Sequence, residues 1–407
     1  MHDVILARID ALADEEVAFL RELVRVPSDN PPGDCTAHAL RAAELLEKMG
    51  FTVERHPVPA DIVRANGMVS AVNLVVRRRF GDGPVIALNA HGDVVPPGEG
   101  WTMPPYGGEV KDGFMYGRGV AVSKSDFATY AFALRALEPV ADGLGGTVEL
   151  HLTYDEEAGG EIGPAWLLEQ GISKPDLAIG AGFAHGIVTA HNGCLHLEIE
   201  VEGKAAHAAR PDLGHDALEA TTDVLRAIYA LRPELAKVRS SVEGIGSPQI
   251  TVGLIKGGIN TNVVPDRVTL RLDRRLIPEE NGAEVEATLT KVITESVAGK
   301  PGITVRCTRV MLAEPLKPIA GIEPLVEALE AHGSRVLGHP VKPHGVPLYT
   351  DGRHYSARGI PTVLYGAGPR TIQEARGHAA DERLSLADLD AATRVVALTL
   401  ADVLRRA

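Results

Sequence analysis

Along the first half of the chain, short apolar runs rich in β-branched residues alternate with stretches of helical period. Residues 84–93 (PVIALNAHGD), 146–157 (GTVELHLTYDEE) and 175–183 (PDLAIGAGF) are predicted to be strands, and residues 126–140 and 163–171 between them are predicted to be helices. Strands that alternate with helices are typical of βαβ units, in which helices cover a mostly parallel sheet. The pattern therefore predicts an α/β fold.

The pattern changes near residue 190 and changes back after about residue 312. Residues 196–211 and 247–276 contain strands that alternate apolar with polar positions, and helices are predicted at 216–231 and from about Gly282. Such alternation favours an antiparallel sheet with one face toward water. We therefore predict a mostly parallel α/β domain, formed by residues 1–189 and 313–407, that is interrupted by a smaller α+β domain at 190–312.

Composition narrows the possible functions. A chain of 407 residues is too long for one ordinary core, and its net charge of −13 argues against nucleic acid as a partner. No run approaches the roughly 18 apolar residues of a membrane-spanning helix, and the acidic N-terminus lacks a signal-peptide pattern, so we expect a cytoplasmic protein without a membrane partner. Three widely spaced cysteines argue against a disulfide framework or a thiolate zinc site, which leaves His, Asp and Glu as metal ligands.

Candidate chemistry gathers where predicted strands end, which is where sites form in parallel sheets. His91 and Asp93 follow one strand, the adjacent Glu156 and Glu157 follow another, and His378 lies near the C-terminus. Hydrolysis of an amide needs a polarised carbonyl, an activated water and a base, and a metal with an open position beside an unligated carboxylate meets all three needs. Asp93 is spaced to orient the His91 imidazole.

The order of several motifs is similar to that of a known family. The segments HGDVVP, YGRG, DEEAGG, GCLHLEIEVEGKAAHAARPDLGHDALEA, INTNVVP, LDRRLIP and GHAADE occur in this sequence over nearly the whole chain. Together they resemble the co-catalytic metallohydrolases, a family that includes aminoacylase, acetylornithine deacetylase, succinyl-diaminopimelate desuccinylase and glutamate carboxypeptidase. The resemblance implies a catalytic domain with two adjacent metals and a smaller inserted domain that usually forms the contact of a homodimer.

The resemblance also implies roles for individual residues of the larger domain. His91 resembles the histidine ligand of the first metal, and Asp93 resembles its orienting partner. Glu156 resembles the general base, while Glu157 and His378 resemble ligands of the second metal. A T-D segment of the family corresponds to the one that contains Asp351, which we expect near the substrate.

Three further roles fall in the predicted insertion. His207 resembles the histidine that reaches across a dimer to the substrate or its developing oxyanion. Asn262 and Arg275 resemble the polar pair that holds the carboxylate of a small-molecule substrate. An anionic tetrahedral intermediate needs such donors.

Two ligands of the family pattern are missing. The segment GRGVAVSKSD has Val122 where a bridging aspartate is expected, and AIGAGFAHG has Gly182 where the first site takes a carboxylate. Without a bridging carboxylate two dications would repel, so we expect one metal per subunit, held by His91, Glu157 and His378. Zn is favoured, with Mn, Co and Fe as alternatives. Asp126, one helical turn beyond Val122, and His185, three residues beyond Gly182, are candidate replacement ligands.

We therefore predict a metal-dependent hydrolase of amide bonds in small carboxylated substrates, such as N-acyl amino acids or dipeptides. Retention of Glu156, His207, Arg275 and the remaining polar set favours this function. Two alternatives stay open at this point. One is non-peptide C–N cleavage in a mononuclear or metal-free site of the same fold, and the other is a non-catalytic binding protein for a carboxylated ligand.

Overall fold

The computed structural model describes residues 1–406, which form two compact units. The first unit comprises residues 1–189, 318–344 and 350–406, and the second comprises residues 190–317 and 345–349. The second boundary lies five residues beyond the predicted one, and the segment 345–349 returns to the second unit from a distant part of the sequence.

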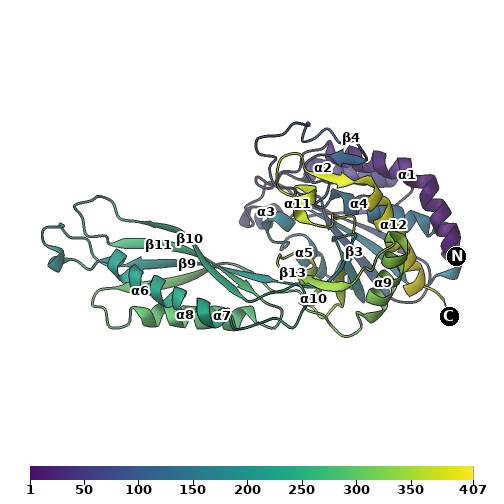
Figure 1. The fold of residues 1–407 in the computed structure, drawn as a ribbon. Coiled ribbons are helices and arrows are strands. Elements are labelled where there is room, and N and C mark those ends of the chain that lie inside the picture. Colours follow the sequence, from purple (N-terminus) through teal and green to yellow (C-terminus); the bar gives the residue numbers. More distant parts are fainter. Residues whose placement is uncertain (407) are drawn as a thin grey trace. The chain divides into compact units, whose positions relative to one another are not determined.

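The first unit has an α/β architecture (Figure 1). Its helices are α1 (His2–Val24), α2 (Thr36–Lys48), α3 (Ala60–Ala65), α4 (Lys124–Ala136), α5 (Pro164–Glu169), α9 (Glu323–Leu337), α10 (Gly352–Ser356), α11 (Ile372–Ala375) and α12 (Leu386–Val403). Its strands are β1 (Val53–Pro57), β2 (Val72–Arg79), β3 (Val85–His91), β4 (Glu109–Lys111), β5 (Phe114–Tyr116), β6 (Thr147–Thr153), β7 (Leu177–Gly180), β14 (Thr362–Leu364) and β15 (Arg383–Ser385), together with β8 (Ile187–His191) and β13 (Pro343–Val346), whose last two residues fall within the bounds of the second unit.

The main sheet has the strand order β1-β2-β6-β3-β7-β14-β8-β13. Its centre, β6-β3-β7-β14, is parallel, whereas the pairs β1–β2, β2–β6 and β14–β8 are antiparallel. On one face, Ile86 and Leu88 of β3 join the main core with helices α1, α4 and α12, and on the other Ala87 packs with Tyr355 of α10. In β3 and β6, His91 stands opposite Thr153, so both strands end at the same edge. This arrangement confirms the predicted fold class.

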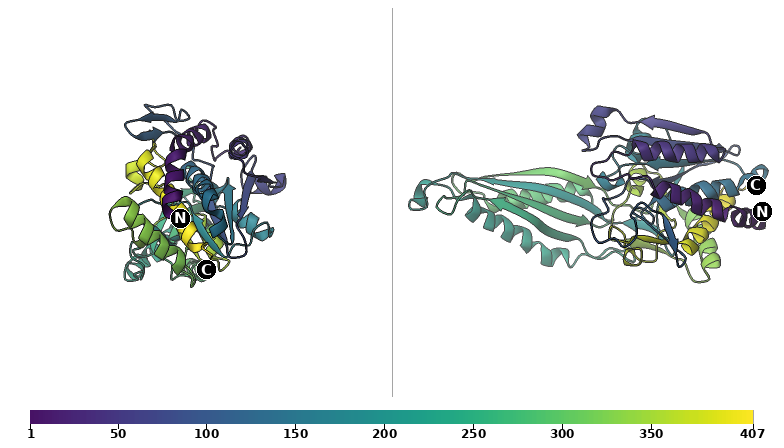
Figure 2. Two further views of the ribbon diagram at one scale, coloured as in Figure 1. Left: turned by 90° about the vertical axis from the view of Figure 1, so that its right-hand side faces the viewer. Right: turned by 90° about the horizontal axis from the view of Figure 1, so that it is seen from above.

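The second unit consists of a sheet with helices on one face. Its elements are β9 (Gly193–Glu202), α6 (Ala217–Ala230), α7 (Arg232–Leu235), β10 (Gln249–Gly257), β11 (Arg267–Leu276), α8 (Gly282–Ser296) and β12 (Thr304–Ala313). The antiparallel sheet has the order β10-β11-β9-β12. Leu195, Leu197 and Ile199 of β9 pack with α6 and α8, which lie along one face of the sheet (Figure 2), while His196 and Glu198 alternate with them on the other face. The predicted alternation of apolar and polar residues thus reflects a sheet with one face covered by helices and the other exposed to solvent.

Among the described residues, no helix is both long and apolar enough to cross a membrane.

Candidate active site

His91 is the last residue of β3, and its ring is held by the residues that follow it. His91 Nδ1 lies 3.0 Å from the backbone oxygen of Asp93 and 3.3 Å from its Oδ1. Because Nδ1 donates its proton to these oxygens, Nε2 carries the lone pair whenever the ring is neutral. Nε2 lies 3.9 Å from Oε2 of Glu156. The lone pair therefore points toward the carboxylates of the neighbouring strand end.

Asp93 is fully buried and connects the two strand ends. Its Oδ1 accepts the backbone N–H of Glu156 at 3.2 Å, and its Oδ2 accepts that of Glu157 at 3.1 Å. The amide of Asn30 donates to Oδ2 as well, at 3.0 Å. One side chain thus orients His91 and fixes the turn that carries both glutamates, which supports the positioning role inferred for Asp93 from sequence.

His91, Glu156 and Glu157 each offer one ligand atom, and these three atoms lie within 4.8 Å of one another. His378 adds a second imidazole from the C-terminal part of the chain, with its Nε2 3.3 Å from Oε1 of Glu157. His378 has a φ of 62°, a left-handed conformation that is uncommon for a residue other than glycine. The structure therefore brings together four of the residues predicted from sequence.

The electrostatics of these residues are dominated by burial and by excess negative charge. Burial raises the pKa of Glu156 to about 8, although His91 acts in the opposite direction. Burial also disfavours a charge on His91, but Glu156 and Asp93 outweigh it and raise the pKa of the imidazole well above its ordinary value. Burial and the nearby Glu156 raise the pKa of Asp351 well above its usual range. The site holds more carboxylates than its own cations balance.

This donor set fits a divalent metal. Two imidazoles and the Glu157 carboxylate are ligands that Zn²⁺, Mn²⁺ and Fe²⁺ accept, and a dication would offset the excess of carboxylates. Nearby, Oδ1 of the buried Asp155 has no hydrogen-bond partner among the described residues. His91, Glu157 and His378 are the side chains that would hold the ion.

The structure shows what occupies the two positions that lack a carboxylate. Val122 is partly buried and packs against the main core. Its backbone N–H and that of Ala121 donate to Oε1 of Glu382, at 3.3 and 3.1 Å, and Arg118 pairs with Oε2 of Glu382 at 2.6 Å. At Gly182, a Cβ would lie 2.6 Å from the backbone nitrogen of Tyr365. A side chain therefore fits at residue 122 but not at residue 182.

Asp126 and His185 differ in their surroundings. The carboxylate of Asp126 accepts the N–H groups of Gly182 at 3.2 Å and Ala367 at 2.7 Å, and burial raises its pKa to about 7, opposed by these bonds and by His91. His185 directs Nε2 to Asp388 at 3.0 Å and Nδ1 to His339 at 3.1 Å. Both ring nitrogens of His185 are engaged, so we favour Asp126 over His185 as a replacement ligand.

Asp351 lies beside the Glu156 turn. Oδ2 of Asp351 accepts the hydroxyl of Thr153 at 3.5 Å, and a Cβ on Gly160, whose φ is 73°, would lie 2.1 Å from Oδ1. Gly160 is therefore required by this close approach. The buried Arg353, whose guanidinium donates to the backbone oxygen of Gly159, offsets part of the negative charge of Glu156 and Asp351. Arg353 was not identified from sequence, where only its closeness to Asp351 in the chain could have indicated it.

The remaining predicted residues belong to the second unit. His207 is exposed, and its Nδ1 accepts the N–H of Ala209 at 3.0 Å. Asn262 is exposed as well, and its backbone oxygen accepts the N–H of Ala208 at 3.0 Å, which places it beside His207. Arg275 donates from Nε to Oδ1 of Asp273 at 3.0 Å. These contacts lie within the second unit and leave the predicted roles of the three residues as proposals.

Comparison with known proteins identifies the family to which the chain is similar. Residues 87–402 match the family model described as peptidase family M20/M25/M40. A succinyl-diaminopimelate desuccinylase from Wolinella succinogenes is 28% identical over 348 residues, which cover 80% of this chain and 86% of that protein. The corresponding protein from Sphingopyxis alaskensis is 30% identical over 291 residues, covering 69% of this chain and 73% of its own length.

Solved structures show the same fold. An M20 family metallo-carboxypeptidase from Sulfolobus solfataricus superimposes with a TM-score of 0.75 at 18% identity, covering 96% of this chain and 99% of its own. A dinuclear metal-binding M20 peptidase from Bacillus subtilis gives a TM-score of 0.71 at 17% identity, with 97% and 99% covered. Neither the changed-reaction alternative nor the binding-protein alternative is favoured by these matches. The chain belongs to peptidase family M20/M25/M40 and is a metal-dependent hydrolase of carbon–nitrogen bonds.

Proposed function

We propose that this enzyme hydrolyses the amide bond of small N-acyl amino acids or dipeptides that carry a free carboxylate. The observation that supports it most strongly is the convergence of His91, Glu156 and Glu157 at one edge of the sheet, with His378 directed at Glu157. Relatives described as succinyl-diaminopimelate desuccinylases favour an acyl group that itself bears a carboxylate.

The chain's own residues would divide the chemistry as follows. Glu156 takes a proton from the attacking water and delivers it to the leaving nitrogen, because it lies beside His91. Asp93 keeps His91 in the tautomer that leaves Nε2 free. His207 donates to the developing oxyanion, and Asn262 and Arg275 hold the substrate carboxylate. A divalent ion, when bound, polarises the carbonyl and lowers the pKa of water.

We propose one metal per subunit, with Zn favoured over Mn, Co and Fe and with His91, Glu157 and His378 as ligands. Val122 supplies no ligand atom, and the backbone of β14 leaves no room for a side chain at Gly182. Asp126 is the candidate additional ligand, because it is buried, reaches the N–H of Gly182 and interacts electrostatically with His91.

We further propose a cytoplasmic homodimer with its contact in residues 190–312. Strand β10 is at the edge of its sheet and exposes Leu254 and Ile255, which are 67% and 57% accessible, while Ile259 just beyond it is 79% accessible. Exposed apolar groups on an edge strand favour pairing with another chain. The three free cysteines are typical of a reducing compartment. Sedimentation velocity of the purified enzyme tests the dimer, and fractionation of cells tests the compartment.

The test of the function combines substrates with metal analysis. Purified enzyme is assayed against N-succinyl, N-acetyl and dipeptide substrates, each paired with the analogue in which the carboxylate is an amide. We expect turnover of the free acids only, and elemental analysis should show about one metal per chain that is lost in His378→Ala. Val122→Asp, which restores a carboxylate where one fits, should add about one further metal per chain. No turnover of any free acid after loading with Zn, Mn and Co would overturn the proposal.

A further inference from the structure

The second unit carries a group of metal-ligand side chains that the hydrolytic site does not use. Cys194 and His196 are two residues apart on β9, and Asp273 stands directly opposite His196 on β11. Their side chains project from the face of the sheet opposite α6 and α8. Cys194 is fully buried, whereas His196 and Asp273 are 37% and 30% exposed in their side chains. The three come from two paired strands, which hold them rigidly.

The donor atoms already lie close to tetrahedral spacing. His196 Nε2 is 3.2 Å from Cys194 Sγ and 2.9 Å from Asp273 Oδ2, and Sγ is 3.5 Å from the same Oδ2. Ligands bound at 2.0–2.3 Å around a tetrahedral ion are about 3.3–3.8 Å apart. A Zn²⁺-sized ion therefore needs these donors to separate by only a few tenths of an ångström.

Surrounding contacts leave lone pairs of Asp273 and His196 available to an ion. Arg275 donates from Nε to the other carboxylate oxygen of Asp273, at 3.0 Å, which fixes the carboxylate and leaves Oδ2 toward Cys194 and His196. No hydrogen bond with the described residues engages Nδ1 of His196. The proton of His196 can therefore move to Nδ1 when Nε2 binds a metal, and the thiol proton of Cys194 leaves to solvent.

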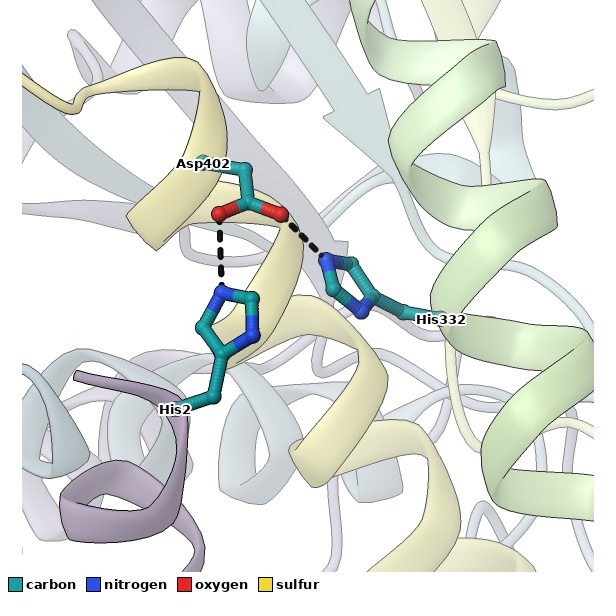
Figure 3. Close-up of side chains that lie close together, drawn as sticks. All are labelled: His2, His332 and Asp402. Atoms are coloured by element: carbon teal, nitrogen blue, oxygen red, sulfur yellow. Dashed lines mark hydrogen bonds and ion pairs between the residues drawn. The ribbon is translucent and has the colours of Figure 1, made fainter.

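A second group of similar composition shows that residue types alone do not identify a metal site. His2, His332 and Asp402 also lie close together (Figure 3), with the two Nε2 atoms 2.8 and 2.6 Å from the oxygens of Asp402. Arg335 donates to Nδ1 of His332 at 3.0 Å, so Nε2 of that ring must carry the proton. Arg405 donates to Asp402 as well, at 2.9 Å. The His2 group is a satisfied hydrogen-bond network, and its lone pairs are occupied.

We propose that Cys194, His196 and Asp273 form a second metal site, which shares no ligand with the hydrolytic centre, for one borderline divalent ion such as Zn²⁺ or Co²⁺. Solvent completes the coordination through the exposed side of His196 and Asp273. The sequence rule that seeks paired cysteines misses this site, because its third ligand comes from a neighbouring strand 77 residues away.

Cobalt provides the test, because only a thiolate ligand gives a sulfur-to-cobalt charge-transfer band in the near ultraviolet. The metal-free full chain is titrated with Co²⁺ and followed by absorption. We expect the band to saturate at one site, to vanish in Cys194→Ser and to require at least about tenfold more Co²⁺ in His196→Ala. Cys307→Ser is the matched control, since Cys307 lies on the adjacent strand and packs on the helix-covered face.

Either of two results would overturn the proposal: no charge-transfer band in the wild-type chain, or a band that persists in Cys194→Ser. Circular dichroism verifies that Cys194→Ser is folded, and the more exposed His196→Ala gives an independent result if it is not. The hydrolytic site contains no sulfur ligand, so loss of amide hydrolysis leaves this band unchanged. The proposed amide hydrolysis and the proposed Cys194 metal site can therefore be tested independently of each other.

Discussion

Two groups of histidine and carboxylate side chains in the first unit have similar composition but opposite hydrogen-bonding balance. One has an excess of carboxylates, and the other has an excess of donors. Around His91, several buried carboxylates face one another with few cations, and the pKa of Glu156 is raised to about 8, chiefly by burial. Around Asp402, two imidazoles and Arg405 donate to a single carboxylate, and the pKa of Asp402 is lowered by the two histidines despite its partial burial. A count of ligand types would place a metal in both. Of these two groups, the balance of donors and acceptors favours a metal only at the one around His91.

Glu156→Gln gives the largest expected contrast. The amide keeps the size of the side chain but cannot accept the proton, so we expect kcat to fall by about 10²–10⁴-fold while bound metal stays unchanged. Steady-state kinetics and elemental analysis measure the two quantities. Glu161→Gln, an exposed glutamate of the same loop, is the control and should keep wild-type kcat. Equal losses in both variants would contradict the role of Glu156 as base.

Glu16→Gln tests the effect of burial on a carboxyl group that belongs to neither of the two groups. Burial raises the pKa of Glu16 to about 8, although Thr393 donates a hydrogen bond to it at 2.6 Å. Because the unfolded chain ionises near pH 4.5 and the folded chain near pH 8, this group lowers stability progressively between these values and by at most about 5 kcal/mol above them. We expect urea unfolding to show the variant more stable than wild type at pH 9 and equal to it at pH 4.

The exposed Glu15 is the control for that experiment. Glu15→Gln removes only a surface pair with Arg135, which contributes about 0–1 kcal/mol. A Glu16→Gln variant with the same pH dependence as Glu15→Gln would show that the carboxyl of Glu16 ionises normally in the fold.

His378→Ala tests metal binding at the group around His91, and His332→Ala makes the same test at the group around Asp402. We expect metal affinity to fall by about 10–100-fold or more, because one imidazole ligand is lost. His332→Ala should leave metal affinity at the wild-type value. Competition with a chromophoric chelator measures both. A loss of metal in His332→Ala would mean that the Asp402 group holds an ion after all.

Asp402→Asn is expected to have the smallest effect, and only on stability. Two histidines lose their carboxylate acceptor, which costs about 1–3 kcal/mol in the free energy of unfolding. Denaturant unfolding measures this cost, while kcat and metal content should match those of wild type. Asp390→Asn is the control, because it removes a more exposed pair with Arg394. We expect it to lower the free energy of unfolding by less than Asp402→Asn does.

Local patterns predicted much of this molecule. The period of apolar positions predicted α4, α6 and α8, and the placement of polar residues after apolar runs identified His91, Asp93, Glu156 and Glu157. Each of these signals lies within a few residues of sequence. The Arg118–Glu382 pair, the contact of Asp126 with Gly182 and the third ligand on β11 join residues far apart in the chain, and no short-range pattern encodes them.

Position 182 bears on how this active site can change by mutation. Valine and aspartate codons differ at the middle base, so a carboxylate at residue 122 is within reach of one nucleotide substitution. A side chain at residue 182 would meet the backbone of Tyr365 and Leu364, and no codon change there avoids it without a shift of β14. Directed evolution toward a two-metal enzyme should therefore proceed through residue 122 and recruit Asp126, while libraries randomised at residue 182 return glycine.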